Sequence, residues 1–282
     1  MKVIRFAKEL HRELKQIKQR DKSIGFVPTM GALHQGHLSL IEKAKQENDI
    51  VVCSIFVNPT QFNNSSDLDT YPISIEQDKA LLLESQCDFL YLPTVEDVYP
   101  QGPISDSYMF SGIEHEMEGK HRPGHFDGVA TVVKRLFDIC IPDRAYFGEK
   151  DFQQLRIIQE LISQTEQRIE IIPCSIFREQ DGLAMSSRNR KLSQTQREQA
   201  PEIYKALKHL KENLKYNDIS DLLKNLKHSI NKQSELELEY IEVADISSLK
   251  SASNIQEDHK YRAFIAVFAG DIRLIDNIAL NY

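Results

Sequence analysis

Two histidines stand three residues apart in the segment VPTMGALHQGHLSL, residues 27–40, where an apolar run ends and a helical pattern begins. This spacing puts the imidazoles of His34 and His37 on one face of a first helical turn. Unpaired backbone N–H groups and the positive end of the helix dipole favour an anion there, and Gly31 and Gly36 would let the backbone approach it closely. Phosphate binding, a packed structural pair and a two-histidine metal site all fit this pattern, although a third ligand at metal-site spacing is missing.

The segment SIFVNPTQF, residues 54–62, carries a second candidate. The predicted strand ends before Asn58 and Pro59, so Gln61 lies in the following loop. Its amide can both donate and accept hydrogen bonds, which suits a hydroxy acid. Ordinary Asn-Pro turn chemistry explains the same residues.

The segment FGEKDFQQL, residues 147–155, also follows a predicted strand. Gly148 can allow a close approach, Lys150 supplies a mobile positive charge, and Asp151 is a plausible cap for the next helix. We interpret Lys150 as a phosphate clamp. A solvated surface lysine is the alternative.

The segment MEGKHRPGHFDGV, residues 117–129, is interpreted as an ordered loop that enters a helix beginning near Gly128. The guanidinium of Arg122 could balance a carboxylate or a phosphate. A surface ion pair with Glu118 is the alternative.

The segment AMSSRN, residues 184–189, joins two hydroxyls to a permanent charge. Ser186 and Ser187 offer hydroxyl and backbone donors, and Arg188 offers a fork-shaped guanidinium. This set suits phosphate oxygens. An ordinary turn would explain SSRN by itself.

Alternating strands and helices must hold these segments. Strands that are apolar on both faces and alternate with helices imply βαβ units, hence a Rossmann-like parallel α/β sheet with helices on both faces. Such sheets bind ligands beyond the carboxyl ends of their strands. The apolar runs of strand length are 24–27, 50–57, 89–92, 145–147 and 169–176, and helical periodicity occupies 38–44, 80–83, 129–137 and 155–161.

The character of the chain changes after about residue 177. Charged helical segments at 193–214 and 220–229 precede two strand-like runs at 236–243 and 261–268. This order predicts a smaller α+β C-terminal domain. The expected boundaries are therefore 1–176 for the larger α/β domain and 177–282 for the smaller domain.

Composition favours a cytoplasmic protein with small-molecule partners. Of 282 residues, 41% are apolar, and 35 basic against 42 acidic residues give a net charge of −7, which argues against a general nucleic-acid surface. Residues 1–20 lack the apolar core of a secretory signal, and the longest apolar stretch, 50–57, is too short to span a membrane. The four cysteines are widely spaced without a CxxC pair, which predicts buried, reduced thiols.

The motif PTMGALHQGH resembles the HxGH signature of the nucleotidylyltransferase superfamily, which is related to class I aminoacyl-tRNA synthetases. Its flanking residues resemble the pantothenate synthetase (pantoate-β-alanine ligase) family. The resemblance continues in family order through SIFVNPTQF, MEGKHRPGHFDGVATVV, FGEKDFQQL, DGLAMSSRNRKLS and RLIDN and covers nearly the full chain. Two positions depart from the pattern: Ala184 replaces the first lysine of the synthetase KMSKS loop, and Phe177 replaces a smaller aliphatic residue.

The resemblance implies a two-step reaction. The carboxylate of (R)-pantoate attacks the α-phosphorus of ATP to give pantoyl adenylate and pyrophosphate, and the amine of β-alanine then displaces AMP to give pantothenate. It also implies a homodimer, and Mg²⁺ is expected with ATP rather than on protein side chains alone. The charge and the short apolar runs argue against a nucleic-acid or membrane partner. Because an acyl adenylate is easily lost to water, the domain order and the position of the SSRN segment predict that the C-terminal domain closes as a lid.

Roles for particular residues are implied as well. The catalytic residues would be His37, His34, Lys150 and Arg188, with His37 as the proton donor. Pantoate and β-alanine would contact Gln61, Gln154, Asn58 and Arg122, with Glu118 and His125 in the site wall. ATP would contact Met30, Gly31, Ala32, Leu33, His34, Gln35, Gly36, His37, Gly148, Glu149, Lys150, Asp151, Phe177, Met185, Ser186, Ser187 and Arg188.

Two other functions fit parts of the same pattern. A nucleotidylyltransferase would transfer AMP to a phosphorylated acceptor and leave it there. A non-catalytic nucleotide- or RNA-binding protein could keep the fold, although the acidic balance and the three candidate loops favour an enzyme.

Overall fold

The computed structural model describes residues 1–62, 68 and 71–280, and these residues form two compact units. The first unit comprises Met1–Glu149 and Gln153–Ser175. The second comprises Lys150–Phe152 and Ile176–Tyr282. The chain therefore leaves the first unit twice, once for only three residues.

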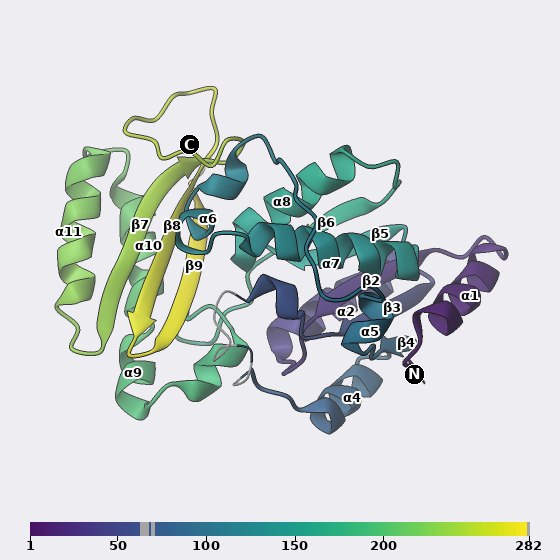
Figure 1. Ribbon diagram of the computed structural model, residues 1–282. Coiled ribbons are helices and arrows are strands. Elements are labelled where there is room, and N and C mark those ends of the chain that lie inside the picture. Colours follow the sequence, from purple (N-terminus) through teal and green to yellow (C-terminus); the bar gives the residue numbers. More distant parts are fainter. Residues whose placement is uncertain (63–67, 69–70, 281–282) are drawn as a thin grey trace. The chain divides into compact units, whose positions relative to one another are not determined.

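A parallel sheet forms the centre of the first unit (Figure 1). Among the described residues it has six strands in the order β1-β4-β3-β2-β5-β6. The strand order reverses between β2 and β5, and ligands bind at such reversals, beyond the carboxyl ends of the strands. The strands are β1 (Lys2–Ile4), β2 (Ile24–Thr29), β3 (Ile50–Ile55), β4 (Phe89–Tyr91), β5 (Arg144–Gly148) and β6 (Glu170–Cys174).

Helices cover both faces of this sheet, which explains why its strands read as continuous apolar runs. Val27 of β2 lies in a core cluster with Ile41 of one helix and Leu82 of another. The preceding Phe26 faces the other way and packs edge-on against Phe137, with ring centroids 6.1 Å apart. The helices of this unit are α1 (Ala7–Lys18), α2 (Gln35–Glu47), α4 (Ile75–Glu84), α5 (Val95–Val98), α6 (Glu118–His121), α7 (His125–Cys140) and α8 (Phe152–Ser163), whose first residue belongs to the second unit.

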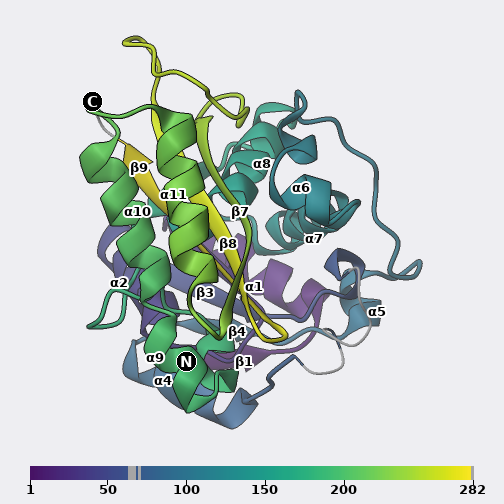
Figure 2. The ribbon, with the colours of Figure 1, turned by 90° about the vertical axis from the view of Figure 1, so that its left-hand side faces the viewer.

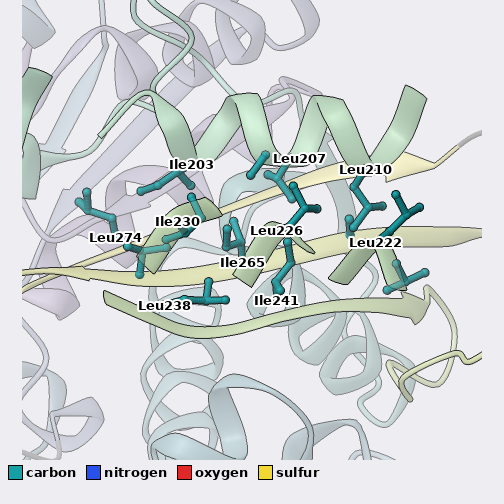
Figure 3. Packing of buried hydrophobic residues seen from close by; sticks show 14 of the residues in the cluster. Ile203, Leu207, Leu210, Leu222, Leu226, Ile230, Leu238, Ile241, Ile265 and Leu274 are labelled. Atoms are coloured by element: carbon teal, nitrogen blue, oxygen red, sulfur yellow. The ribbon is translucent and has the colours of Figure 1, made fainter. Parts of the chain in front are cut away.

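The second unit contains a small antiparallel sheet. Within the described part of the chain its three strands are ordered β7 (Leu236–Asp245), β8 (Tyr261–Ala269) and β9 (Ile272–Leu280). Helices α10 (Glu202–Asn213) and α11 (Ile219–Asn231) cover one face of this sheet (Figure 2). The labelled aliphatic side chains of Figure 3 form the core between them: Ile203, Leu207, Leu210, Leu222, Leu226, Ile230, Leu238, Ile241, Ile265 and Leu274.

The expected fold class is confirmed: a parallel α/β sheet with helices on both faces, and a smaller α+β unit. Two element boundaries were wrong. Helix α7 begins at His125 rather than near Gly128, because His125 and Phe126 are buried and extend the helix by packing. The expected helix at 193–214 is divided into α9 (Gln194–Gln199) and α10, since Pro201 has no N–H to continue the first helix.

The four cysteines all lie in described positions, and each is buried and outside any disulfide, as expected. Burial raises the pKa of every one of these thiols, to about 12 for Cys87 and about 11 for Cys174. Across the described ranges, no group of three or more His, Cys, Asp or Glu side chains could hold a metal ion. No helix in those ranges is long and apolar enough to cross a membrane.

Candidate functional site

The histidine motif forms the turn between β2 and α2. His34 is the N-cap of α2, and its ring centroid lies 4.0 Å from that of His37. The backbone N–H of His34 donates to Nδ1 of His37 over 3.3 Å. Because Nδ1 accepts this bond, the neutral His37 ring carries its proton on Nε2, which leaves a donor on the opposite side of the ring. The first turn of α2 therefore combines an imidazole N–H with the backbone N–H groups of Gln35 and Gly36.

A buried carboxylate that the sequence analysis missed holds this turn in place. Asp78 of α4 is only 1% exposed. Its oxygens accept hydrogen bonds from the backbone N–H groups of Ala32 and Leu33, over 2.9 and 2.8 Å, and from the hydroxyl of Ser74 over 3.1 Å. Gly31 and Ala32 have φ values of +87° and +50°, so two successive residues adopt the left-handed conformation that aims these N–H groups at Asp78.

These contacts separate the residues expected to bind ATP into buried and accessible ones. Ala32 and Leu33 are each about 1% exposed, and their N–H groups bond to Asp78. His34, Gly36 and His37 remain partly exposed, and Gln35 is exposed. The first turn of α2 is therefore the accessible part of the motif.

The loop after β3 fixes Gln61. Asn58 is 1% exposed, and its Nδ2 donates to Oε1 of Gln61 and to the carbonyl of Gly128, both over 3.1 Å. Nε2 of Gln61 lies 3.1 Å from the sulfur of Met30, in the histidine turn. Asn58, expected to contact pantoate, thus has its amide committed to the protein and orients Gln61. Tyr99 completes the arrangement by donating its hydroxyl proton to Oδ1 of Asn58 over 2.7 Å.

Residues at the start of α7 and just before it hold the same loop from another side. Nδ1 of His125 lies 2.8 Å from the carbonyl oxygen of Gln61, and Arg122 donates to that oxygen over 3.4 Å. Arg122 also lies 3.9 Å from the carboxylate of Glu118, so the ion pair that the sequence left as an alternative is present. Gln154 is half-buried in α8, and the buried neighbouring Gln153 accepts from the backbone N–H of Glu118 over 3.0 Å.

Gly128 allows α7 to pack directly on this loop. A Cβ atom at Gly128 would lie 2.3 Å from the carbonyl oxygen of Thr60 and 2.9 Å from Cα of Gln61. We expect Gly128→Ala to lower the free energy of unfolding by about 1–3 kcal/mol through overpacking. The family resemblance implies that Gln61 contacts pantoate, so we also expect the variant, which displaces the Gln61 loop, to raise KM for pantoate more than KM for ATP. Urea unfolding and steady-state kinetics test both effects. Lys134→Ala, on the more exposed side of α7, is the control, and equal kinetics for the two variants would contradict this role.

Gly148 and Glu149 belong to the first unit, and the other remaining candidate residues belong to the second. A short turn there carries Ser186, Ser187 and Arg188. Ser186 caps the 3-10 turn Ser187–Lys191, and its Oγ accepts from the backbone N–H of Arg188 over 3.3 Å. The backbone N–H of Met185 donates to the carbonyl of Phe177 over 3.0 Å, while the Phe177 side chain is 40% exposed. The backbone thus makes the structural contact of Phe177, so the unusual side chain leaves this turn unchanged.

The second departure from the family pattern also has a structural reason. Ala184 is 4% exposed and forms a β-bridge with Arg178, and its carbonyl accepts from Asn189 over 3.1 Å. A lysine side chain could not occupy this buried position without rearrangement. Lys150 and Asp151 also belong to the second unit, and Lys150 Nζ lies 3.9 Å from the Asp151 carboxylate.

A parallel sheet whose order reverses beside a histidine-capped helix defines a nucleotide-binding α/β protein of the HxGH type. The family model for pantoate-beta-alanine ligase matches residues 2–279. The pantothenate synthetase of Flavobacterium psychrophilum is 50% identical over 270 residues, 95% of each chain, and that of Christiangramia forsetii is 45% identical over the full length of both. The chain belongs to the pantoate-β-alanine ligase family.

Solved structures agree with this assignment. The pantothenate synthetase of Thermus thermophilus has a TM-score of 0.92, with 38% identity and full coverage of both chains. The pantoate-beta-alanine ligase of Francisella tularensis, complexed with beta-gamma ATP and beta-alanine, has a TM-score of 0.83, with 41% identity over 99% of this chain and 98% of that one. The resemblance stated from the motifs is confirmed.

Proposed function

We propose that this enzyme condenses (R)-pantoate with β-alanine, consumes ATP, releases AMP and pyrophosphate, and does so through a pantoyl adenylate. The observation that carries this proposal is the match to the pantoate-beta-alanine ligase family over residues 2–279. The histidine turn at the carboxyl end of β2 supports it independently, because a helix N-terminus with an imidazole donor suits a phosphate.

The bond changes balance in two steps. A carboxylate oxygen of pantoate forms a bond to the α-phosphorus, and the bond from that phosphorus to the bridging oxygen breaks, so pyrophosphate leaves with the electron pair. The amine of β-alanine then bonds to the acyl carbon, AMP leaves with the former carboxylate oxygen, and the amine loses a proton. Neither step needs a covalent enzyme intermediate, and the buried thiols with raised pKa values suit no nucleophilic role.

His37 acts in this proposal as a hydrogen-bond donor at the α-phosphate. Its Nδ1 accepts from His34, so the neutral ring donates through Nε2 as charge grows on the phosphoryl oxygens. His34 shares the same helix terminus. Lys150 and Arg188 neutralise the β and γ phosphates, since a lysine and a guanidinium both bind phosphate oxygens.

We assign the accessible first turn of α2 and the segments around Lys150 and Arg188 to ATP. The remaining members of the ATP set are Met30, Gly31, Gln35, Gly36, Gly148, Glu149, Asp151, Phe177, Met185, Ser186 and Ser187. Gln61 and Gln154 contact pantoate and β-alanine. Asn58, Arg122 and His125 hold the Gln61 loop, which their hydrogen bonds support.

Residues 1–176 form the nucleotide- and pantoate-binding domain in this proposal, and residues 177–282 act as a lid over the reactive adenylate. Small-angle scattering with and without ATP and pantoate tests the closure. Equal radii of gyration in the two states would contradict it.

Three further properties belong to the proposal. Mg²⁺ accompanies ATP, because it prefers phosphate oxygens with a few carboxylates. The enzyme works as a homodimer, as its family resemblance implies, and in the cytoplasm, as its four unlinked thiols suggest. Activity lost on chelation and restored by Mg²⁺, and a dimer mass by light scattering, would support the first two.

A substrate-omission assay tests the reaction. With ATP, pantoate and β-alanine together, we expect AMP and pyrophosphate in equal amounts with pantothenate. Without β-alanine, we expect pyrophosphate release to stop near one equivalent per enzyme, with the nucleotide held as the adenylate. A product that retains the nucleotide would indicate a nucleotidylyltransferase, and ATP binding without pyrophosphate release would indicate a non-catalytic protein.

A further inference from the structure

The motif RLIDN, residues 273–277, lies in β9 and has no part in the chemistry described so far. Its last two residues, Asp276 and Asn277, are only 3% and 1% exposed. Consecutive side chains of a strand point to opposite faces of the sheet. These two buried polar groups therefore lie in different surroundings and need different partners.

Asp276 lies on the face that α10 and α11 cover. It is paired in register with Ile265, a member of the core cluster on that face. Both oxygens of Asp276 accept from the guanidinium of Arg178, over 2.6 and 2.9 Å. Burial raises the pKa of Asp276, and the hydrogen bonds from Arg178 oppose that shift.

Arg178 connects Asp276 to the segment expected to bind phosphates. Its Nη1 donates to the carbonyl of Gly182 over 3.0 Å, and its guanidinium lies 3.7 Å from the ring centroid of Tyr204. It directly follows Phe177, whose carbonyl accepts from Met185. Asp276 therefore fixes the base of the segment that leads to Ser186 and Arg188.

Asn277 serves the opposite face. Its Oδ1 accepts from Nη1 of Arg262, and its Nδ2 donates to the carbonyl oxygen of Lys150 over 2.9 Å. The guanidinium of Arg262 lies 4.1 Å from the ring centroid of Phe152. Asn277 thus holds the backbone of Lys150 directly and reaches Phe152 through Arg262. Because Arg262 offers a donor on one side and Lys150 an acceptor on the other, the orientation of the Asn277 amide is fixed.

We infer that Asn277 is a positioning residue for Lys150 in the adenylation step. A lysine side chain loses considerable rotamer freedom when it is ordered, so a fixed backbone beneath it reduces the part that must be ordered on binding. Asn277 touches no substrate in this inference. It acts through the carbonyl of Lys150, as Asp276 acts through Arg178 on the second phosphate-binding segment. The inference rests on the proposed role of Lys150 at the phosphates.

The variant Asn277→Asp separates the two contacts of this side chain. Aspartate keeps an acceptor for Arg262 but loses the donor to the Lys150 carbonyl and faces it with an oxygen. Because misplacement of a reacting or charged group by about 1 Å can cost about 10²-fold, we expect the single-turnover adenylation rate to fall about 10- to 100-fold. We expect KM for pantoate to stay within about 2-fold of its original value. A purely structural defect would instead change both the adenylation rate and this KM.

A double-mutant cycle with Lys150→Ala identifies the route of the effect. If Asn277 acts through Lys150, Asn277→Asp should slow the Lys150→Ala enzyme by less than about 2-fold. Asn277→Ala serves as a second variant should the aspartate variant fold poorly. Asn231→Ala is the matched control, because Asn231 also binds a backbone group of the second unit, the N–H of Leu238 over 2.9 Å, and should leave the rate unchanged.

The outcomes distinguish the two proposals. Equal slowing in both backgrounds, or an unchanged rate in the folded Asn277 variants while Lys150→Ala is slow, would overturn the positioning role alone. A Lys150→Ala enzyme that adenylates at the original rate would overturn the role of Lys150 at the phosphates and the inference with it.

Discussion

Replacing His37 with alanine should slow adenylation by about 10² to 10³, the usual loss of about 3–4 kcal/mol for one preorganised donor. The variant removes the Nε2 donor, whose direction is set by the hydrogen bond from the His34 backbone to Nδ1. ATP affinity should change much less, because the donor matters most when charge develops on the α-phosphate. Single-turnover pyrophosphate release and equilibrium ATP binding measure the two quantities separately.

Two further variants sharpen the His37 experiment. His37→Gln retains an N–H donor but does not titrate, so partial recovery with a flatter pH profile would indicate hydrogen-bond donation rather than proton transfer. His115→Ala, at a histidine whose side chain is 81% exposed in the same unit, is the control. Unaltered adenylation in His37→Ala, with a defect confined to folding or product release, would rule out the assigned role.

Replacing Asp78 with alanine should lower the free energy of unfolding by about 3–5 kcal/mol, because two buried N–H groups and one hydroxyl lose a charged acceptor. That is a large share of the roughly 5–15 kcal/mol that stabilises a typical domain. Adenylation should slow as well, since the turn that Asp78 holds leads into His34. Urea unfolding and single-turnover kinetics measure both effects.

Asp78→Asn and Glu76→Ala complete the Asp78 experiment. Asparagine keeps the volume and one acceptor, so the free energy of unfolding of this variant should lie between those of the wild type and the alanine variant. Glu76 lies on the same helix with its side chain 85% exposed, and its ion pair with Lys79 should contribute less than about 1 kcal/mol. A loss from Asp78→Ala no larger than that from Glu76→Ala would contradict the anchoring role.

The central sheet was predictable because its strands bury both faces, so Ile24–Thr29 and Ile50–Ile55 read as apolar runs. Other elements carried weaker signals. Helix α1 buries only Leu10 and Leu14 among many charges, and its pattern resembles a solvated segment. Strand β9 contains Asp276 and Asn277, whose burial depends on partners far away in the sequence. Local periodicity cannot show such partners.

The candidate site likewise contains residues that the sequence reveals and residues that it does not. His34 and His37 could be found from the sequence because their chemistry and spacing are local. Asp78 bonds to residues 45 and 46 positions away, and Asn277 bonds to a residue 127 positions away. In the sequence Asp78 stands among other polar residues, and Asn277 is a polar residue within an apolar run, so neither shows its partner. Only the folded chain shows that Asp78 binds the turn before His34 and that Asn277 binds the backbone of Lys150.

The transfer of a pantoate carboxylate oxygen to AMP tests the proposed reaction most directly. The enzyme would be given ATP, β-alanine and pantoate labelled with ¹⁸O in its carboxylate, and the AMP would be analysed by mass spectrometry. If that carboxylate attacks the α-phosphorus, each AMP formed with fully labelled pantoate carries one ¹⁸O. Unlabelled AMP formed together with pantothenate would contradict the adenylate.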